Sequence, residues 1–226
     1  LKSRFPNRVI PSWEALRSAV QAGAAGHFGL ANPQSSASGA FARFFMAREW
    51  AERNGVTWSK KAVEDPRLWQ WMNGFEENVP DYARLSSDMV RDLALGTADR
   101  YWWAIAYESD AIRWLQAGKP LEVFYLPRTN YADHPVCLVD YKGMDGRVTK
   151  ARAALDNYLR SPEAQKLLLQ NGFRPMEIEI AAVDKNNPFR NPQFKKRGLR
   201  EKGFRLDQRI NYRILNNLNV QWGQRF

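Results

Sequence analysis

A serine-rich loop supplies the clearest group of side chains for binding a small ligand. Ser35, Ser36 and Ser38 bring three hydroxyls close together in the sequence, and Gly39 would let the backbone approach a ligand. The loop leads into a predicted helix, whose first amides and positive dipole end favour an anion or an oxygen-rich group. Helix capping, which needs only one serine, is the alternative explanation. We therefore interpret Ser35, Ser36, Ser38 and Gly39 as candidate ligand-binding residues.

A second candidate contact lies at Tyr107 and Glu108, which follow an aromatic run and precede Ser109 and Asp110. Carboxylates at the start of a helix complement the helix dipole, which would be a purely structural role. They could instead receive a cationic group of a ligand or a metal ion, although no second cluster with metal-ligand spacing supports a metal. The sequence leaves both explanations open.

Metal-binding and catalytic patterns are scarce. His27 and His134 are the two histidines, and no carboxylate flanks His27, so we predict no metal site. The sequence contains no G-x-S-x-G elbow, no Walker loop and no G-x-G-x-x-G motif. The single Cys137 excludes an internal disulfide, and its apolar neighbours predict a buried, inert thiol. We predict a binding protein without catalytic residues or a cofactor, rather than an enzyme.

Alternating strands and helices must position these loops. Strands are predicted at residues 27–31, 79–82, 100–107, 121–126 and 135–140. Helices are predicted from Trp13 onward and at residues 40–54, 67–73, 86–95, 110–117, 149–159 and 162–171. This order predicts an α/β fold with a mixed, mostly parallel sheet flanked by helices. Such sheets bind ligands at the carboxyl ends of their strands, where both candidate loops would lie.

The positive charge is concentrated near the end of the chain. The net charge is +10, and residues 184–213 hold ten Lys and Arg against three Asp and Glu. Apolar residues are spaced through this basic tail, which predicts that it wraps its own protein with Arg and Lys stems over apolar surface. Nucleic-acid binding through residues 185–213 is the less favoured alternative, because it needs those cations exposed.

The order of several short motifs resembles a known family. These motifs are Asn32-Pro33 with the Ser-Ala-Ser-Gly turn, Gly96–Asp99 before a strand ending in Tyr107-Glu108-Ser109, Val123–Pro127, Tyr158–Gln165 and Gly172–Pro175. Over roughly residues 9–176 the chain resembles extracellular solute-binding proteins of the ABC-transporter type. That family has the type II periplasmic-binding fold and includes relatives of molybdate and sulfate binders.

The resemblance implies two α/β lobes that close over a ligand, with one nearly complete lobe and part of a second in this chain. Residues 1–118 would form the second, ligand-binding lobe. Residues 119–176 would form hinge strands and carboxy-terminal helices that return to the first lobe. Residues 177–226 would be a basic tail that wraps the protein or binds a partner. The amino-terminal portion of the first lobe is then expected upstream of Leu1.

The implied function is capture of a small polar or anionic solute in an interlobe cleft for ABC-type uptake. The expected partners are that solute and an ABC permease or another protein subunit, in the periplasm or outside the cell. Membrane anchoring would require an upstream segment, because no stretch of this sequence is long and apolar enough to span a bilayer. The alternative is a non-transport interaction domain of the same fold, within a larger protein or assembly, that uses the basic tail to bind a partner.

Overall fold

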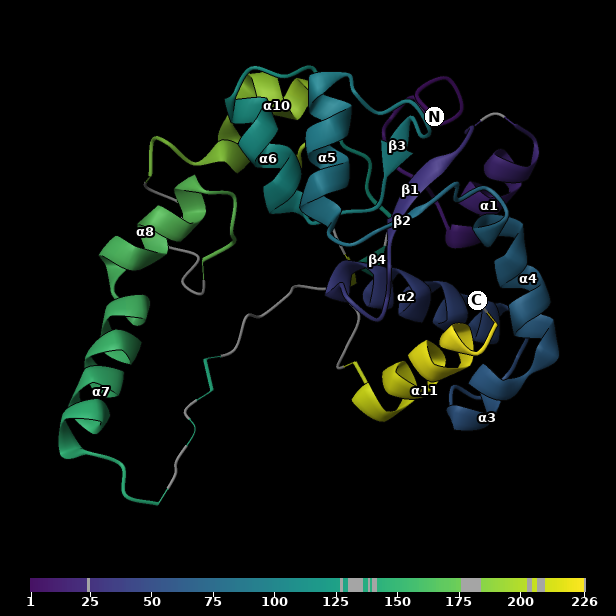
Figure 1. Ribbon diagram of the computed structural model, residues 1–226. Helices are drawn as coiled ribbons and strands as arrows, with labels where there is room; N and C mark the ends of the chain where they lie inside the picture. The colour runs from purple at the N-terminus through teal and green to yellow at the C-terminus, as the bar shows by residue number, and fades with distance from the viewer. Residues whose placement is uncertain are drawn as a thin grey trace.

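Three short parallel strands form the sheet at the centre of the protein (Figure 1). The computed structural model describes residues 1–23, 25–126, 128–129, 136–137, 139, 142–175, 184–202, 205–206 and 210–225. The strands are β1 (Phe28–Ala31), β2 (Tyr82–Ala83) and β3 (Trp103–Ala104), in the order β2-β1-β3. All four residues of β1 are buried, as expected for a central strand covered on both faces.

The sheet confirms one prediction and corrects another. β1 pairs in parallel with both neighbours, with Leu30 opposite Tyr82 and Phe28 opposite Trp103. The predicted strands 27–31 and 100–107 are therefore neighbours that end at one edge. The second of them is much shorter than predicted, because only Trp103 and Ala104 pair as a strand. The bulky residues before it, including Trp102 with 77% of its surface exposed, do not extend the ladder.

The described helices are joined by loops, and several of them begin or end at a residue that caps them. They are α1 (Trp13–Gln21), α2 (Ala37–Arg53), α3 (Lys60–Glu64), α4 (Pro66–Glu76), α5 (Ser86–Leu95), α6 (Glu108–Gln116), α7 (Gly146–Arg160), α8 (Pro162–Gln170), α10 (Pro192–Lys196) and α11 (Tyr212–Gly223). A 3₁₀ turn, η1 (Pro188–Arg190), precedes α10. Asp65 caps α4 ahead of Pro66, and Gly96 ends α5 in the left-handed conformation with φ of 72°.

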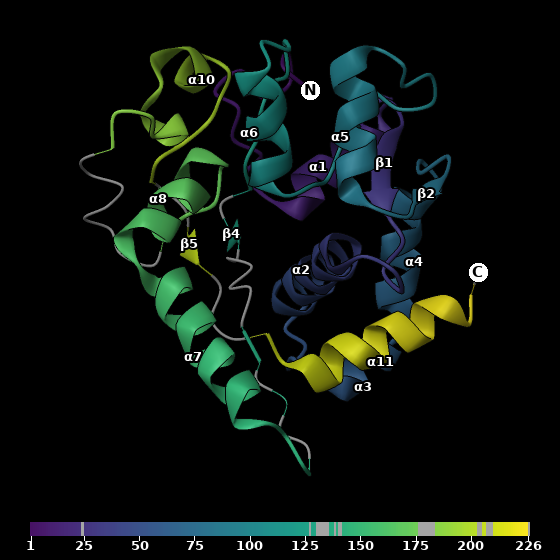
Figure 2. The same ribbon diagram turned by 60° about the vertical axis from the view of Figure 1, so that its left-hand side comes forward.

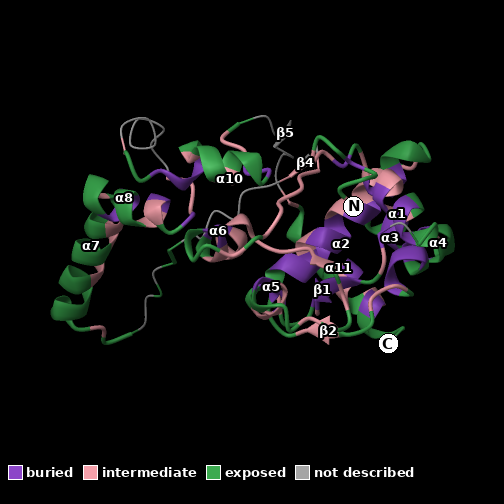
Figure 3. Ribbon diagram, turned by 90° about the horizontal axis from the view of Figure 1, so that it is seen from above, coloured by how far each residue is buried: buried purple, intermediate pink, exposed green. Residues whose placement is uncertain are grey.

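The two faces of β1 meet different helices. Phe28 and Leu30 belong to the main core, which α1, α2 and α4 build around the sheet. Gly29 faces the opposite layer, where a Cβ atom would lie 2.8 Å from the sulfur of Met89 on α5. Figure 3 shows buried residues gathered on α1, α2, α4 and β1. The sheet therefore lies between two helical layers, as in other α/β folds.

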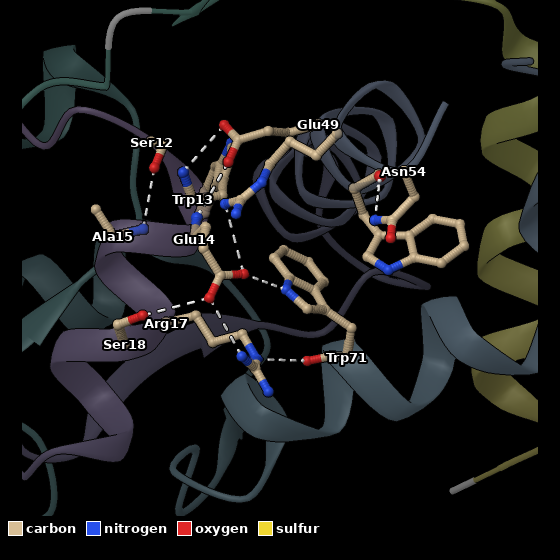
Figure 4. Close-up of polar contacts among 11 residues, drawn as sticks. Ser12, Trp13, Glu14, Ala15, Arg17, Ser18, Glu49, Asn54 and Trp71 are labelled. Atoms are coloured by element: carbon tan, nitrogen blue, oxygen red, sulfur yellow. Dashed lines mark hydrogen bonds and ion pairs between the residues drawn. The ribbon is translucent and has the colours of Figure 1, made fainter. Parts of the chain in front are cut away.

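A carboxylate on α2 fixes the start of α1 (Figure 4). Glu49 accepts hydrogen bonds of 3.0 Å from the backbone amides of Trp13 and Glu14. The Glu14 carboxylate in turn accepts from the indole of Trp71 on α4 and from Arg17. These contacts join α1, α2 and α4 on one side of the sheet. A negative charge at the first amides of α1 also complements the helix dipole.

Two sequence predictions are wrong beyond the sheet. Residues 121–126 do not form a strand, and their one ladder contact is an isolated parallel bridge between Val9 and Tyr125. Cys137 is exposed rather than buried. Most of the predicted strand 135–140 lies outside the described residues. A separate two-stranded ladder joins β4 (Arg128–Thr129) to β5 (Arg205–Leu206) in parallel.

The described part of the tail packs on the rest of the chain at two places. Phe189 and Leu199 are buried with Ile112 of α6 and Leu169 of α8 in a second cluster. Helix α11 lies across α2 and α3, and four of its apolar residues join the main core (Figure 2). These residues are Ile214, Leu215, Leu218 and Trp222.

Truncation after Pro175 is expected to lower the melting temperature by at least about 10 °C. Each buried apolar side chain contributes about 1.5–3 kcal/mol, and 1 kcal/mol corresponds to about 2–4 °C in a domain of this size. Thermal unfolding followed by circular dichroism checks the change. An unchanged melting temperature, with loss of association to an acidic partner, would identify the tail as an interaction arm.

Candidate functional site

Three connecting loops meet at the carboxyl edge of the sheet. Each strand runs in the same direction, so β1, β2 and β3 deliver residues 32–36, 84–85 and 105–107 to one edge. The helices α2, α5 and α6 then begin beside that edge. Ligand sites of open α/β sheets lie at this position, because helix amino termini and strand ends converge there.

The serine loop (residues 32–39) presents hydroxyls that do not cap α2. Ser36 occupies the N-cap position with an extended backbone, but its side chain forms no capping hydrogen bond. Its hydroxyl oxygen lies 2.9 Å from that of the buried Ser38, so the two hydroxyls bond to each other. The first amides of a helix have no acceptor within it, and the Ser36 side chain does not supply one to α2. Capping therefore does not account for Ser36 and Ser38.

The other polar groups of the serine loop tie it to the connection between β2 and α5. The Ser35 hydroxyl donates to the carbonyl of Arg84 over 3.2 Å, and the amide of Asn32 donates to Ala83 over 2.8 Å. The side chain of Asn32 accepts from the amide of Gln34 at 2.8 Å, which closes a local turn. The loop thus has a defined conformation held from two neighbouring strand ends.

Gly39 has a packing role that the sequence did not suggest. A Cβ atom at this position would lie 2.0 Å from the carbonyl oxygen of Ala31, the last residue of β1. Only glycine lets the first turn of α2 approach the strand end so closely. Contact between the Gly39 amide and a ligand stays a prediction.

Tyr107 and Glu108 begin α6 at the same edge of the sheet. Tyr107 is the N-cap residue, and burial raises the pKa of its hydroxyl, with the charge of Asp110 raising it further. The Glu108 carboxylate accepts from Arg174 at 2.8 and 2.9 Å and from the hydroxyl of Tyr125. This partly buried ion pair already neutralises Glu108.

The three helix starts differ in charge. The first turn of α5 contains Asp88, and that of α6 contains Glu108 and Asp110. Asp110 accepts from the Ser86 hydroxyl at 2.9 Å, and burial raises its pKa. The first turn of α2 contains no carboxylate. Of the three helix starts, that of α2 at the serine loop is therefore the one where a bound anion would meet the least repulsion.

A buried arginine lies against the two ends of the serine loop. Arg43 of α2, with none of its surface exposed, donates to both carboxylate oxygens of Glu76 at 3.0 and 3.1 Å. It also lies 3.4 Å from the carbonyl oxygens of Ala31 and Gly39, at the two ends of the loop. Burial raises the pKa of Glu76 and lowers that of Arg43, while the pairing opposes both shifts.

A sequence model of the family described as bacterial extracellular solute-binding protein matches residues 3–174, more than half of the chain. The chain belongs to this family. No curated protein and no solved structure matches it. Membership supports a solute-binding protein of the ABC-transporter type, with a ligand-binding role in transport and a periplasmic or extracellular location. Proteins of this family are generally not enzymes.

Two residues near the serine loop of this solute-binding protein are not among the candidates that the sequence predicts. Arg84 follows β2, is exposed and forms no ion pair with another described residue. Its position directly after a strand, where ligands of such sheets bind, is a sequence signal that could have identified Arg84 as a candidate. Arg43 follows Ala40 by three positions and precedes Ala47 by four, so helical periodicity places it on the buried face of α2.

The described part of the solute-binding protein gives no sign of a metal site or a membrane span. Its His, Cys, Asp and Glu side chains form no group of three or more that could hold a metal ion. None of the helices described has the length and hydrophobicity needed to cross a bilayer.

Proposed function

We propose that this solute-binding protein captures a small polar or anionic solute at the serine loop for ABC-type uptake. The observation that carries the proposal is the Ser36–Ser38 hydroxyl pair, which lies at the start of α2 and caps no amide of that helix. Hydroxyls and unsatisfied helix amides together offer donors to oxygen atoms of a ligand. Ser35 would support the loop through its bond to the Arg84 carbonyl.

Two features favour an anion over a cation at this position. The first turn of α2 lacks the carboxylates that α5 and α6 contain. Arg84 is exposed, and its backbone carbonyl accepts from Ser35 of the loop, so we propose that its side chain adds positive charge near a bound anion. Tyr107 would supply a further contact from the adjacent strand end. Glu108 would contact solute only if its pair with Arg174 opened.

The proposal includes the type II two-lobed architecture, with residues 1–118 as the ligand-binding lobe and 119–176 as the return to the first lobe. Hydrogen bonds between the two segments support a hinge there. The amide of Ile10 donates to Tyr125, and the amide of Tyr125 donates to Arg8. Glu122 pairs with Arg8, so the segment after residue 118 is also joined to the first residues of the lobe by an ion pair.

The alternative role as a non-transport interaction domain has less support. Its basic tail would need free cations and exposed apolar groups. In the described part of the tail, Arg190 and Lys195 pair with Glu201, and Arg197 pairs with Glu122. Phe189 and Leu199 are buried. The same burial argues against a nucleic-acid interface.

The double change Ser36→Ala with Ser38→Ala should weaken solute binding by roughly ten- to a hundredfold. Each hydrogen bond contributes about 0.5–1.5 kcal/mol, so a single change could be nearly silent. Calorimetric titration of the full-length protein with sulfate, phosphate and molybdate measures the loss. Ser18→Ala, at an exposed serine on α1, is the control and should bind as the unmodified protein does. Unchanged affinity in a well-folded double variant would move the site toward Tyr107 and Glu108.

A further inference from the structure

Helix α11 lies outside the residues that match the family model. It contacts the serine loop through its last turn. The family match ends at residue 174, whereas α11 spans Tyr212–Gly223. A Cβ atom on Gly223 would lie 2.2 Å from the side-chain nitrogen of Gln34, so the last turn of α11 packs against the loop itself. The neighbouring Trp222 is buried in the main core.

Trp222 also completes an aromatic enclosure around Arg43. The Arg43 guanidinium lies 4.6 Å from the ring centroid of Trp222 and 5.2 Å from that of Tyr82. The two rings meet edge to face with centroids 5.2 Å apart. The Tyr82 hydroxyl donates to Glu76, which pairs with Arg43. We call these four residues, Arg43, Glu76, Tyr82 and Trp222, the Arg43 cluster.

The Arg43 cluster connects α11 to both ends of the serine loop. Arg43 Nη1 lies 3.4 Å from the carbonyls of Ala31 and Gly39, which are long distances for hydrogen bonds. A shift of the guanidinium by a few tenths of an ångström would break these bonds. Glu76 holds the opposite edge of the guanidinium through two bonds, and the aromatic rings restrict its faces.

We propose that α11 is a positioning element for the serine loop, with Trp222 acting through Arg43. The indole holds the guanidinium where it can bond both loop ends, so the loop keeps the backbone geometry that presents the hydroxyls of Ser36 and Ser38. This role gives the carboxy-terminal helix a part in binding although it lies outside the family match. Its consequence for affinity rests on the proposed solute site, whereas its effect on the loop does not.

Hydrogen–deuterium exchange of the full-length protein tests the positioning role without a ligand. The amides of Gln34, Ser35 and Ser36 all bond within the serine loop and report its geometry. Trp222→Leu, which keeps an apolar side chain but removes the aromatic face, should speed their exchange by about tenfold or more. Trp222→Phe, which keeps an aromatic face beside Arg43, should recover most of the protection that Trp222→Leu loses. Tyr212→Leu, at a residue of α11 with 66% of its surface exposed, is the control and should change nothing.

A second variant tests the connection through Arg43. Arg43→Lys keeps the charge opposite Glu76 but loses the planar guanidinium, whose Nε and Nη2 bond Glu76 while Nη1 reaches both carbonyls, so it should speed exchange in the same loop. The inference would be overturned if the serine-loop amides exchanged equally fast in Trp222→Leu and in the unmodified protein. It would also be overturned if Trp222→Leu and Trp222→Phe changed that exchange equally.

Titration of the same variants with sulfate, phosphate and molybdate separates this inference from the proposed function. Trp222→Leu should weaken binding of any of these anions that the unmodified protein binds, by about tenfold. If the unmodified protein binds none while loop exchange still responds, the positioning role stands and the proposed anion site fails.

Discussion

Replacing Arg43 with methionine should lower the free energy of unfolding by about 3–5 kcal/mol, which is expected when one partner of a buried ion pair is removed. The change leaves the Glu76 carboxylate buried without the two hydrogen bonds that Arg43 supplies. It also removes the guanidinium from the rings of Tyr82 and Trp222 and leaves the loop carbonyls of Ala31 and Gly39 without the bonds from Arg43. Chemical denaturation followed by tryptophan fluorescence measures the loss.

Two further variants show whether the loss comes from the uncompensated charge. Arg43→Met combined with Glu76→Leu should recover much of the stability, because buried ion pairs are often replaced by apolar residues at little net cost. Arg48→Met, on the same helix at a partly exposed pair with Glu52, should cost less than about 1 kcal/mol. Equal losses in Arg43→Met and Arg48→Met would contradict the buried-charge explanation.

The pH dependence of Arg43→Met follows from Glu76. Burial raises the pKa of Glu76 above its ordinary value of 4.5, and Arg43 opposes that rise. Without Arg43 the folded variant should hold the Glu76 proton at a pH where the unfolded chain has lost it. Stability then falls as pH rises from the unfolded pKa through the folded one. The deficit of Arg43→Met relative to the unmodified protein should therefore be smaller at about pH 5 than at about pH 8. A deficit independent of pH would contradict this assignment.

The sequence predicts the frame of this site better than its polar contacts. Caps and glycines placed α4 and α5 within a few residues, since Asp65 and Gly96 act locally. The length of β3 was overestimated, because strand pairing depends on neighbours that aromatic composition does not specify. Periodicity could have exposed Arg43 as buried, but its partner Glu76 lies on another helix and has no local signal.

The same contrast between local signals and contacts from distant parts of the chain applies to the candidate ligand-binding residues. The serine loop was found because strand, hydroxyls and helix start are contiguous in sequence. The sequence leaves the role of Glu108 open, because its partner Arg174 lies 66 positions away and only the fold brings the two together. Arg84 contributes a carbonyl to Ser35 across two strands, a contact that requires the observed order β2-β1-β3.

Gly39→Ala is the second change with a large expected effect, and it should lower the free energy of unfolding by about 3 kcal/mol. The added methyl would lie 2.0 Å from the Ala31 carbonyl oxygen, a backbone atom that cannot turn aside as a flexible side chain can. Either α2 moves away from β1 or the strand end distorts, and overpacking of this kind costs about 1–3 kcal/mol or more. The melting temperature should fall by roughly 6–12 °C, which differential scanning calorimetry can measure.

Gly146→Ala is the matched control for this change. Gly146 begins α7, and a Cβ atom there has no neighbour within 4 Å, so alanine should leave stability unchanged or raise it by up to about 1 kcal/mol. The comparison also separates two roles of Gly39. If close packing on β1 is the role, Gly39→Ala loses stability with or without solute. If the glycine serves only the approach of a ligand to the backbone, the variant keeps its melting temperature and loses affinity for solute alone, because a methyl group at the binding surface blocks contact without disturbing the core.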